Sequence, residues 1–339
     1  MTKMRAPLEL KRPFARLRGW GGVASMAVAC LLAACFVLLP VKGAADEQVA
    51  QGGSGVAHAV QAKAEKCDDE SPDKSLPKSS DDGPTIEAIK ARGDNAKLVI
   101  GVDQNSYRWG YRDPDDGKLH GFDIDLAKEI GRSIMGHEDA VTFRAVPTNQ
   151  RIPMLKSGKV DLIVRTMTIS CSRKAEGVEF STAYFKTGQQ VLAPEGSPIK
   201  GYDDTLSGRR VCVADKSTAD EALKKESHGA KIIRVVNQLD CLVQLQLGNA
   251  DAVVTDSALG AGQAAQDPTV ELKGEPFTEE YYGVAAKQGA DDLVSRVNDI
   301  LEKYRDGGDG SKWEKAYDTW LKADMGDSPG PPPARYQKD

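Results

Sequence analysis

Short apolar runs alternate with stretches of helical periodicity in this chain, and the same alternation occurs twice. The first round contains an amphipathic stretch, "DIDLAKEIGRSIM" (123–135), between strand-like runs. These runs are "KLVIGVD" (97–103), "VTFRAVP" (141–147) and "VDLIV" (160–164). The second round runs from "RRVCVAD" (209–215) to "ADAVVTD" (250–256). Each round predicts a βαβαβ unit with a largely parallel sheet, so we expect an α/β fold of two Rossmann-like lobes. Ligands of such sheets bind outside the carboxyl ends of the strands.

Two extended segments mark the crossings between the lobes. The second unit begins after "GQQVLAP" (188–194), and "YYGVAAK" (281–287) is a strand that can return the chain to the first unit. We therefore predict that residues 85–190 and 284–325 form lobe 1 and that residues 191–283 form lobe 2. Two lobes joined by two hinge strands enclose a cleft that closes around a small ligand.

The first 45 residues resemble an export signal or a membrane anchor, because basic residues precede an apolar, uncharged run at 19–41. Within it, "LAAC" (32–35) has the form of a lipobox, which would make Cys35 the lipidated residue, whereas "GAAD" (43–46) suits ordinary cleavage. An uncleaved anchor is the third alternative. All three place the folded part outside the cytoplasm, and the two anchored forms tether it to the outer face of the membrane.

The segments that flank the predicted lobes have the composition of spacers. Residues 46–84 are rich in Gly, Ser, Ala, Lys and Asp, with almost no large apolar side chain, and predict a flexible linker. Residues 326–339, "GDSPGPPPARYQKD", form a proline-rich tail that cannot continue a helix. We therefore expect the folded lobes to lie between residues 85 and 325.

The net charge argues against nucleic acid as a partner, and the spacing of the cysteines and histidines argues against a bound metal. The chain has a formal net charge of −5 although residues 1–45 carry seven basic side chains and one acid, so the remainder is strongly acidic and ill suited to nucleic acid. Four cysteines lie outside the signal segment, an even number that permits three disulfide pairings in an oxidising compartment. We favour Cys212 with Cys241 and Cys67 with Cys171. No CxxC pair occurs and the four histidines are scattered, so we expect neither a metal nor another cofactor.

One stretch, "VDLIVRTMTISCSRK" (160–174), changes character abruptly. It begins as a buried strand and becomes a run of small hydroxyl side chains, Thr166, Thr168 and Ser170, followed by Arg173. Hydroxyls, backbone amides and one guanidinium therefore lie close together where the chain leaves its core.

Three segments carry a resemblance to a known family. They are "GFDIDLAKEIGRSI" (121–134), "GKVDLIVRTMTISCSRK" (158–174) and "GNADAVVTD" (248–256). Residues 85–323 resemble, in order and spacing, the extracytoplasmic binding proteins for polar amino acids that serve ABC importers. The chain is most similar in character to actinobacterial glutamate/glutamine-binding lipoproteins, some of which resemble sensors. The resemblance implies a periplasmic-binding-protein-like fold, a monomer, and ABC permease subunits or a membrane signalling protein as partner.

The resemblance assigns roles to the groups that would bind the two ends of an amino acid. Arg173 matches the arginine that binds the α-carboxylate, with Thr168 as hydroxyl and amide donor and Thr166 where relatives often carry Gly. Asp256 matches the acid on the opposite lobe that binds the α-ammonium group, although an Asp there also suits a helix N-cap. Ser217 and Thr218 lie where relatives offer backbone groups to the ligand. A capping box with Glu221 explains the same residues.

The side chain of the ligand is the finer question. Arg151 lies where dicarboxylate binders place an arginine, and Arg165 is a second cation at the end of a buried strand. Two arginines favour glutamate or aspartate. The alternative for Arg165 is an internal ion pair, for example with Asp103. Asp103 lies where relatives contact the distal group of the ligand, and an acid there suits an amide, which keeps glutamine and asparagine as candidates.

Three functions are compatible with this pattern. The first is delivery of a small polar amino acid to an ABC importer, with hinge closure on binding. The second is an amino-acid sensor that signals occupancy to a membrane partner and an intracellular kinase pathway. The remote third is a dehydratase-like enzyme on the same fold, but we find no separate catalytic set and no nucleophile beside a base in the sequence, so we expect no enzyme.

Overall fold

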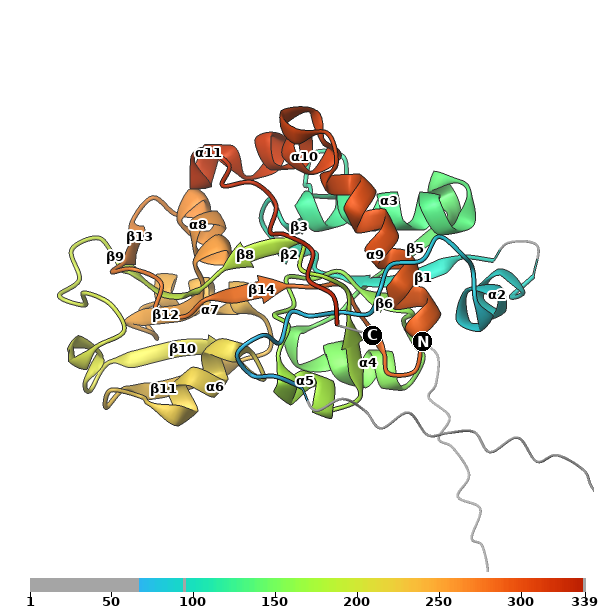
Figure 1. Cartoon of the computed structure of the whole chain (residues 1–339). Coiled ribbons are helices and arrows are strands. Elements are labelled where there is room, and N and C mark those ends of the chain that lie inside the picture. Colours follow the sequence, from blue (N-terminus) through green and yellow to red (C-terminus); the bar gives the residue numbers. More distant parts are fainter. Residues whose placement is uncertain (1–66, 94–95, 338–339) are drawn as a thin grey trace, which may run out of the picture. The chain divides into compact units, whose positions relative to one another are not determined.

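The structure is a computed structural model that describes residues 67–93 and 96–337 (Figure 1). Within these ranges, no helix is long and apolar enough to cross a membrane. The predicted signal segment with Cys35 and the first part of the predicted linker lie outside the described residues. Two five-stranded sheets form the two lobes predicted from the sequence.

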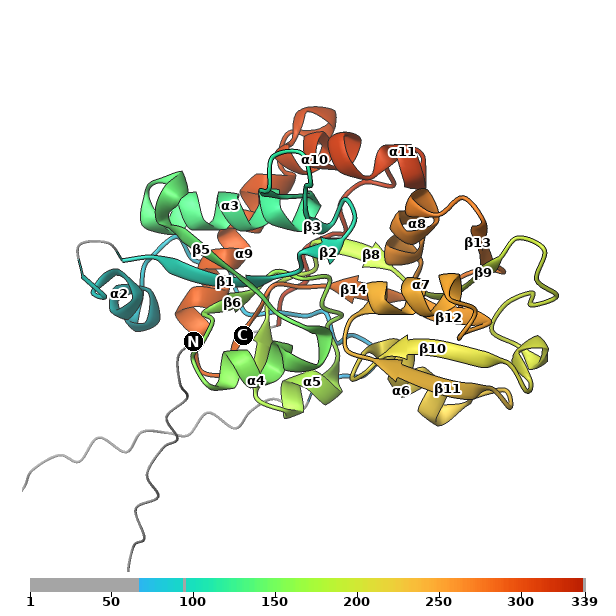
Figure 2. The ribbon, with the colours of Figure 1, turned by 180° about the vertical axis from the view of Figure 1, so that it is seen from behind.

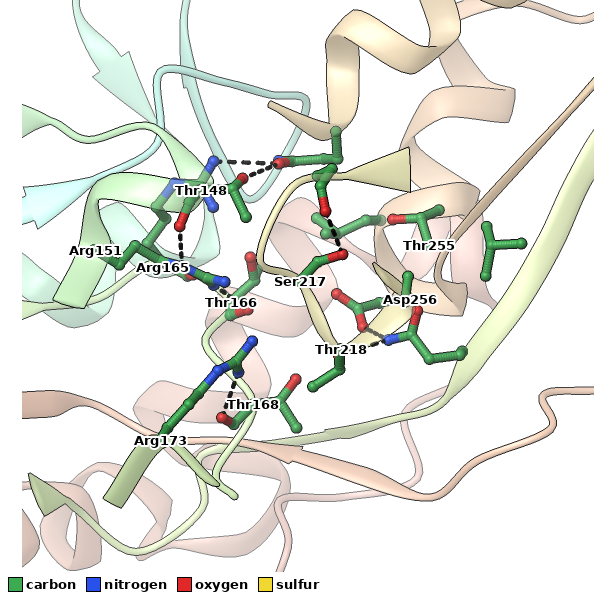
Figure 3. A pocket seen from close by; sticks show the side chains of 16 residues that line it. Thr148, Arg151, Arg165, Thr166, Thr168, Arg173, Ser217, Thr218, Thr255 and Asp256 are labelled. Carbon is green, nitrogen blue, oxygen red and sulfur yellow. Dashed lines mark hydrogen bonds between the residues drawn. The ribbon is translucent and has the colours of Figure 1, made fainter. Parts of the chain in front are cut away.

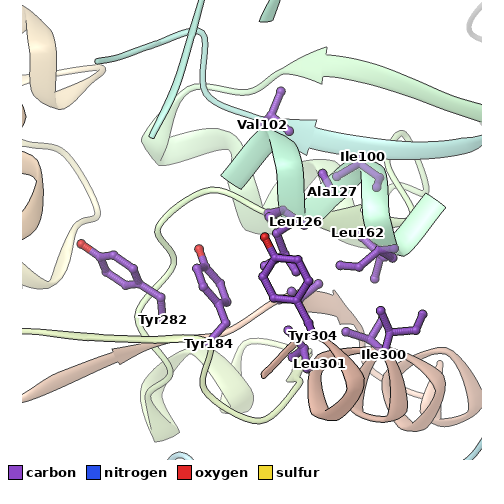
Figure 4. Close-up of a cluster of buried hydrophobic side chains, with 14 of the residues drawn as sticks. Ile100, Val102, Leu126, Ala127, Leu162, Tyr184, Tyr282, Ile300, Leu301 and Tyr304 are labelled. Atoms are coloured by element: carbon purple, nitrogen blue, oxygen red, sulfur yellow. The ribbon is translucent and has the colours of Figure 1, made fainter. Parts of the chain in front are cut away.

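The sheet of lobe 1 has the strand order β5-β1-β6-β15-β7. Its strands are β1 (Leu98–Val102), β5 (Val141–Ala145), β6 (Leu162–Ile163), β7 (Val178–Phe180) and β15 (Ala285–Lys287). β1 pairs in parallel with β5 and β6, whereas β15 runs antiparallel to its neighbours β6 and β7. The helices of this lobe are α2 (Pro84–Lys90), α3 (Phe122–Met135), α4 (Arg151–Lys156), α5 (Cys171–Ala175), α9 (Asp291–Arg305), α10 (Lys312–Trp320) and α11 (Lys322–Met325). Figure 4 shows part of the core, where Ile100 of β1, Leu126 of α3 and Ile300 of α9 lie in one buried cluster.

The sequence explains why α3 forms and where it ends. Its apolar residues recur every three to four positions and are fully or almost fully buried: Ile124, Ala127, Ile130 and Ile134. Each buried isoleucine contributes roughly 1.5–3 kcal/mol to stability. Gly131 allows close packing on β5, because a Cβ at this position would lie 1.9 Å from the side chain of Val141. Gly136 ends the helix in the left-handed conformation, with φ of 87°.

The sheet of lobe 2 has the order β11-β10-β12-β9-β13. Its strands are β9 (Gln189–Pro194), β10 (Arg210–Ala214), β11 (Lys231–Val235), β12 (Ala252–Asp256) and β13 (Val270–Lys273). The helices are α6 (Thr218–Lys225), α7 (Gln238–Gln246) and α8 (Ser257–Gln266). A disulfide joins Cys212 of β10 to Cys241 of α7, which confirms the first of the two favoured pairings.

Two strands connect the lobes. β8 (Phe185–Thr187) and β14 (Glu280–Tyr282) pair antiparallel and form a ribbon between the two sheets (Figures 1 and 2). The second crossing overlaps the strand expected at 281–287, whereas the segment expected to mark the first crossing, 188–194, forms β9 in the sheet of lobe 2. The predicted boundary between residues 190 and 191 falls inside β9, since that strand already belongs to lobe 2 from Gln189 on. A smaller sheet of β2 (Asn105–Ser106), β3 (Gly110–Arg112) and β4 (Leu119–His120) precedes α3.

The described end of the predicted linker differs from a flexible spacer. Asp73 and Ser75 are buried, and Ser75 forms a parallel bridge with Tyr336 of the proline-rich tail. Arg335 makes an ion pair with Asp73 at 3.1 Å, and the Ser75 hydroxyl donates to the carbonyl oxygen of Phe180 in β7 at 2.6 Å. Residues 67–83 and 327–337 thus form a strap along lobe 1. Composition gave no sign of it, because its polar groups are satisfied by partners far away in the sequence.

Candidate functional site

A cavity lies where the carboxyl ends of β6, β10 and β12 meet (Figure 3). Eight of the nine predicted ligand-binding residues line it: Arg151, Arg165, Thr166, Thr168, Arg173, Ser217, Thr218 and Asp256. Asp103, the ninth, does not. The free volume at the centre is about 20 Å³, close to the minimum that holds one water molecule. An amino acid therefore needs some of the lining side chains to move aside.

The turn after β6 is held from behind by a buried acid. Thr166 has a φ of 38°, in the left-handed region that favours glycine, and its backbone N–H donates to Asp123 Oδ2 at 2.9 Å. The Tyr184 hydroxyl donates to the other carboxylate oxygen at 2.8 Å. Burial raises the pKa of Asp123 to about 7. Asp123 lies within one of the motifs quoted above, but no sequence feature distinguishes it from the other acids.

Arg173 lies in α5, directly after this turn, and its side chain is buried. Its Nη1 donates to the carbonyl oxygen of Thr168 at 2.6 Å, and its backbone N–H donates to the N-cap hydroxyl of Ser170. A disulfide between Cys67 and Cys171 fixes the first residue of α5 to the strap, which confirms the second favoured pairing. Arg173 forms no ion pair with any acid among residues 67–93 and 96–337, so its charge is available to a ligand.

Arg151, at the start of α4, is the second buried cation without an acidic partner in the described part of the chain. Its Nε donates to the carbonyl oxygen of Thr148 at 3.0 Å, and its Nη1 lies 3.5 Å from the carbonyl oxygens of Arg165 and Thr166. Burial, followed by the neighbouring charges of Arg173 and Arg165, lowers the pKa of Arg151 well below its usual value. A carboxylate in the cavity would relieve this burial of like charges.

Arg165 forms the internal ion pair that the sequence left open as an alternative. Its Nη2 forms an ion pair with Asp103 Oδ2 at 2.8 Å, and both side chains are buried. Gln238 of lobe 2 joins this pair, donating to Asp103 Oδ2 at 2.7 Å and accepting from Arg165 Nη2 and Thr148 Oγ1 at 3.1 Å each. Gln238 Nε2 also donates to the Ser106 hydroxyl. We call Asp103, Ser106, Thr148, Arg165 and Gln238 the inter-lobe latch.

Asp256 ends β12 and occupies the N-cap position of α8. Its side chain makes no capping hydrogen bond. Instead its Oδ1 accepts from Nε2 of Gln189 at the edge of the cavity. Burial and the nearby carboxylate of Glu280 raise the pKa of Asp256 to about 7. The carboxylate is therefore directed to the site, and capping does not account for it.

The start of α6 combines capping with contact to the site. Ser217 is the N-cap and accepts from the backbone N–H of Asp220 at 3.1 Å. The capping box expected with Glu221 is not formed: the third residue of α6 is Asp220, and its carboxylate accepts from the backbone N–H of Lys216 at 3.4 Å and not from that of Ser217. The Thr218 hydroxyl donates to Glu280 Oε2 at 2.9 Å.

The sequence reasoning missed Glu280 and Gln189. Glu280, on the connecting strand β14, is buried, and its Oε2 also accepts from the Thr168 hydroxyl at 2.7 Å and from Gln189 Nε2 at 3.1 Å. The available signal was the pair of acids in "TEEYYGV" (278–284), because alternation along a strand directs one of two neighbouring side chains inward.

Comparison with known proteins identifies the family. Residues 98–323 match the bacterial extracellular solute-binding proteins, family 3. The chain is 37% identical over 240 residues to the ABC transporter glutamine-binding protein GlnH of Bacillus subtilis. This match covers 71% of this chain and 85% of that protein. It is 30% identical to the glutamate-binding protein GluB of Corynebacterium efficiens, over 65% of this chain and 79% of that protein.

Solved structures of amino-acid-binding proteins are also similar to this chain. An ancestral arginine-binding protein bound to glutamine is 35% identical with a TM-score of 0.61, covering 68% of this chain and 98% of that one. The solute receptor for L-cysteine of Neisseria gonorrhoeae is 28% identical with a TM-score of 0.67, covering 73% and 98%. The matched family consists of extracytoplasmic binding proteins, so the enzyme alternative is dropped. The chain belongs to the bacterial extracellular solute-binding proteins of family 3.

Proposed function

We propose that this protein binds an acidic amino acid, glutamate or aspartate, between its lobes and delivers it to the permease of an ABC importer. The observation that carries the proposal is the pair of buried arginines, Arg151 and Arg173, which line the cavity and form no ion pair among the described residues, although the charge of Asp256 acts on both. A buried cation without a counterion costs several kcal/mol. A ligand with two carboxylates supplies one to each arginine.

The α-groups of the ligand would be shared between the lobes. Arg173 and the amides of the turn at 166–168 belong to lobe 1 and would bind the α-carboxylate, whereas Asp256 belongs to lobe 2 and would bind the α-ammonium group. One small molecule that carries both groups then lowers the free energy of the closed form relative to the open one.

The choice between acid and amide depends on Arg151. Relatives named as glutamine-binding and as glutamate-binding are both similar to this chain, so similarity does not separate the two ligands. Arg165 is neutralised by Asp103, which leaves Arg151 as the cation for a distal carboxylate. Glutamine in the same pose would leave the buried charge of Arg151 without a counterion. This difference favours glutamate and aspartate.

Delivery to a permease follows from closure. Permease subunits that contact both lobes distinguish the closed from the open protein, because closure changes the distance between the two contact surfaces. Lipidation at Cys35 would keep the protein near such a permease and stays a prediction. A sensor would use the same ligand chemistry, and no feature of the described residues favours it over transport.

Calorimetric titration of the full-length protein in detergent with glutamate, aspartate, glutamine and asparagine tests the proposal. We expect the two dicarboxylates to bind more tightly than the amides. We expect Arg151→Gln to remove this preference, and Arg173→Ala to abolish binding of all four ligands. Tighter binding of the amides would contradict the assignment of Arg151, and full affinity in Arg173→Ala would contradict the site itself.

A further inference from the structure

One nitrogen atom beside the cavity is surrounded by more acceptors than it can serve. Nε2 of Gln189 donates to Asp256 Oδ1, and it lies 3.1 Å from both Glu280 Oε2 and Thr218 Oγ1. An amide nitrogen has two hydrogen atoms for these three acceptors. The amide oxygen of Gln189 is buried and has no hydrogen-bond partner in the described part of the chain. A primary ammonium group, with three N–H donors and a positive charge, would fit this position better than the amide does.

Glu280 is the least explained member of this group. Its carboxylate is buried and forms no ion pair with a Lys, Arg or His among the residues that the structure describes. All its donors are neutral: the hydroxyls of Thr168 and Thr218 and the amide of Gln189 on Oε2, and the Thr278 hydroxyl on Oε1 at 3.2 Å. A buried carboxylate without a cation is unfavourable and accepts a cationic ligand readily.

The position of Glu280 links it to both lobes. It lies on the connecting strand β14, and its Oε2 accepts from Thr168 of lobe 1 and from Thr218 of lobe 2. Asp256 is close enough to interact, because the charge of Glu280 contributes to the raised pKa of Asp256. The two carboxylates therefore flank one position, which the Gln189 nitrogen now occupies.

We propose that Glu280 is a second acidic residue for the α-ammonium group of the ligand, beside Asp256, and that the Gln189 nitrogen occupies the ammonium position until a ligand enters. This inference rests on the proposed function and adds a specificity residue to it. Because the cavity has little free volume, the Gln189 side chain moves aside when the ligand enters. The ammonium group then donates to Asp256, Glu280 and Thr218. The site would thereby reject analogues that lack the amino group.

Glu280→Gln tests the inference, because it removes the charge and keeps the length of the side chain and an acceptor for the two threonines. The probes are L-glutamate and glutarate, which has both carboxylates and no amino group. We expect the affinity for glutamate to fall by roughly tenfold to a hundredfold, the range for a hydrogen bond to a charged group. The affinity for glutarate should stay the same or rise. Glu279→Gln is the matched control, since Glu279 is exposed and pairs with Lys186, and it should change neither affinity.

Each outcome bears on one claim. Equal loss for glutamate and glutarate, or no loss for glutamate, would overturn the role of Glu280. Thermal unfolding of the ligand-free variant would reveal a folding defect, and Gln189→Met then gives an independent test. Met lacks the competing nitrogen, so we expect glutamate to bind several-fold more tightly, and weaker binding would contradict the occupancy of the ammonium position by Gln189. Failure of the unmodified protein to bind any of the four amino acids would overturn the proposed function instead. If glutamine is the ligand, the matched pair is glutamine and its analogue without the amino group.

Discussion

The inter-lobe latch leads to a quantitative prediction for Gln238→Ala. Gln238 makes four hydrogen bonds to lobe 1, two of them to the ionised groups of Asp103 and Arg165. The substitution leaves these two groups paired with each other at 2.8 Å, so neither charge loses its counterion. At the lower value of about 1.5 kcal/mol for a hydrogen bond to a charged group, the closed form loses about 3 kcal/mol. The two neutral partners, Ser106 and Thr148, are assumed to bond to water instead. The Kd of the ligand should then rise by about a hundredfold.

Calorimetry and stopped-flow fluorescence measure this effect. The four bonds join the lobes, so we expect them to break when the lobes separate, and most of the change should then appear in the dissociation rate. We expect the lobes to separate without ligand and to expose Gln238 to water, so unfolding of the ligand-free protein should change little. Gln246→Ala, on the same helix and exposed, removes one hydrogen bond to Asp267 within lobe 2 and serves as the control. A Kd within twofold of the unmodified value, or an equal loss of stability without ligand, would refute the latch.

Three further predictions follow from the site and the disulfides. Arg173→Lys should weaken binding strongly, because an ammonium group cannot make the bidentate contact with a carboxylate that a guanidinium makes; calorimetry measures it, and unchanged affinity would contradict the α-carboxylate assignment. Amino-acid affinity should fall about tenfold per pH unit below pH 7 and be constant above pH 8, because Asp256, with its pKa raised to about 7, must lose a proton before it binds an ammonium group; titrations between pH 5.5 and 8.5 check this, and a flat profile would count against Asp256. Replacing Cys212 and Cys241 together by Ala opens a loop with a sequence separation of 29 and should cost about 3–4 kcal/mol of unfolding free energy; denaturant unfolding measures it, with chemical reduction of the unmodified protein as comparison.

The sequence predicted those parts of the site that lie within single motifs. Thr166, Thr168 and Arg173 follow one another on one turn, and Asp256 ends one strand, so spacing and resemblance identify them. Arg165 and Asp103 end two adjacent parallel strands, and the sequence therefore offered their ion pair as an alternative without deciding it. Geometry decides it, since both side chains are buried at the same sheet edge.

Other parts were beyond sequence reasoning because they depend on contacts between distant segments. Glu280 contacts Thr168 across 112 positions, and Gln238 contacts Asp103 across 135. No local pattern marks either residue as part of the site. The strap was missed for the same reason. Its polar composition is typical of a flexible segment, but the buried charge of Asp73 is neutralised by Arg335, 262 positions away.

The connectivity of the two lobes suggests how ligand preference can change. The chain leaves lobe 1 once through β8 and returns once through β14, so lobe 2 is a contiguous insertion between the two strands of a ribbon. Arg151, the cation that would distinguish one ligand side chain from another, lies in the host lobe, whereas Asp256, which would bind the α-ammonium group that all amino acids share, lies in the insert. Exchange of the insert between relatives would keep the amino-acid preference of the host. Recombination at the ribbon could therefore produce new combinations of permease contacts and ligand choice without a new cavity.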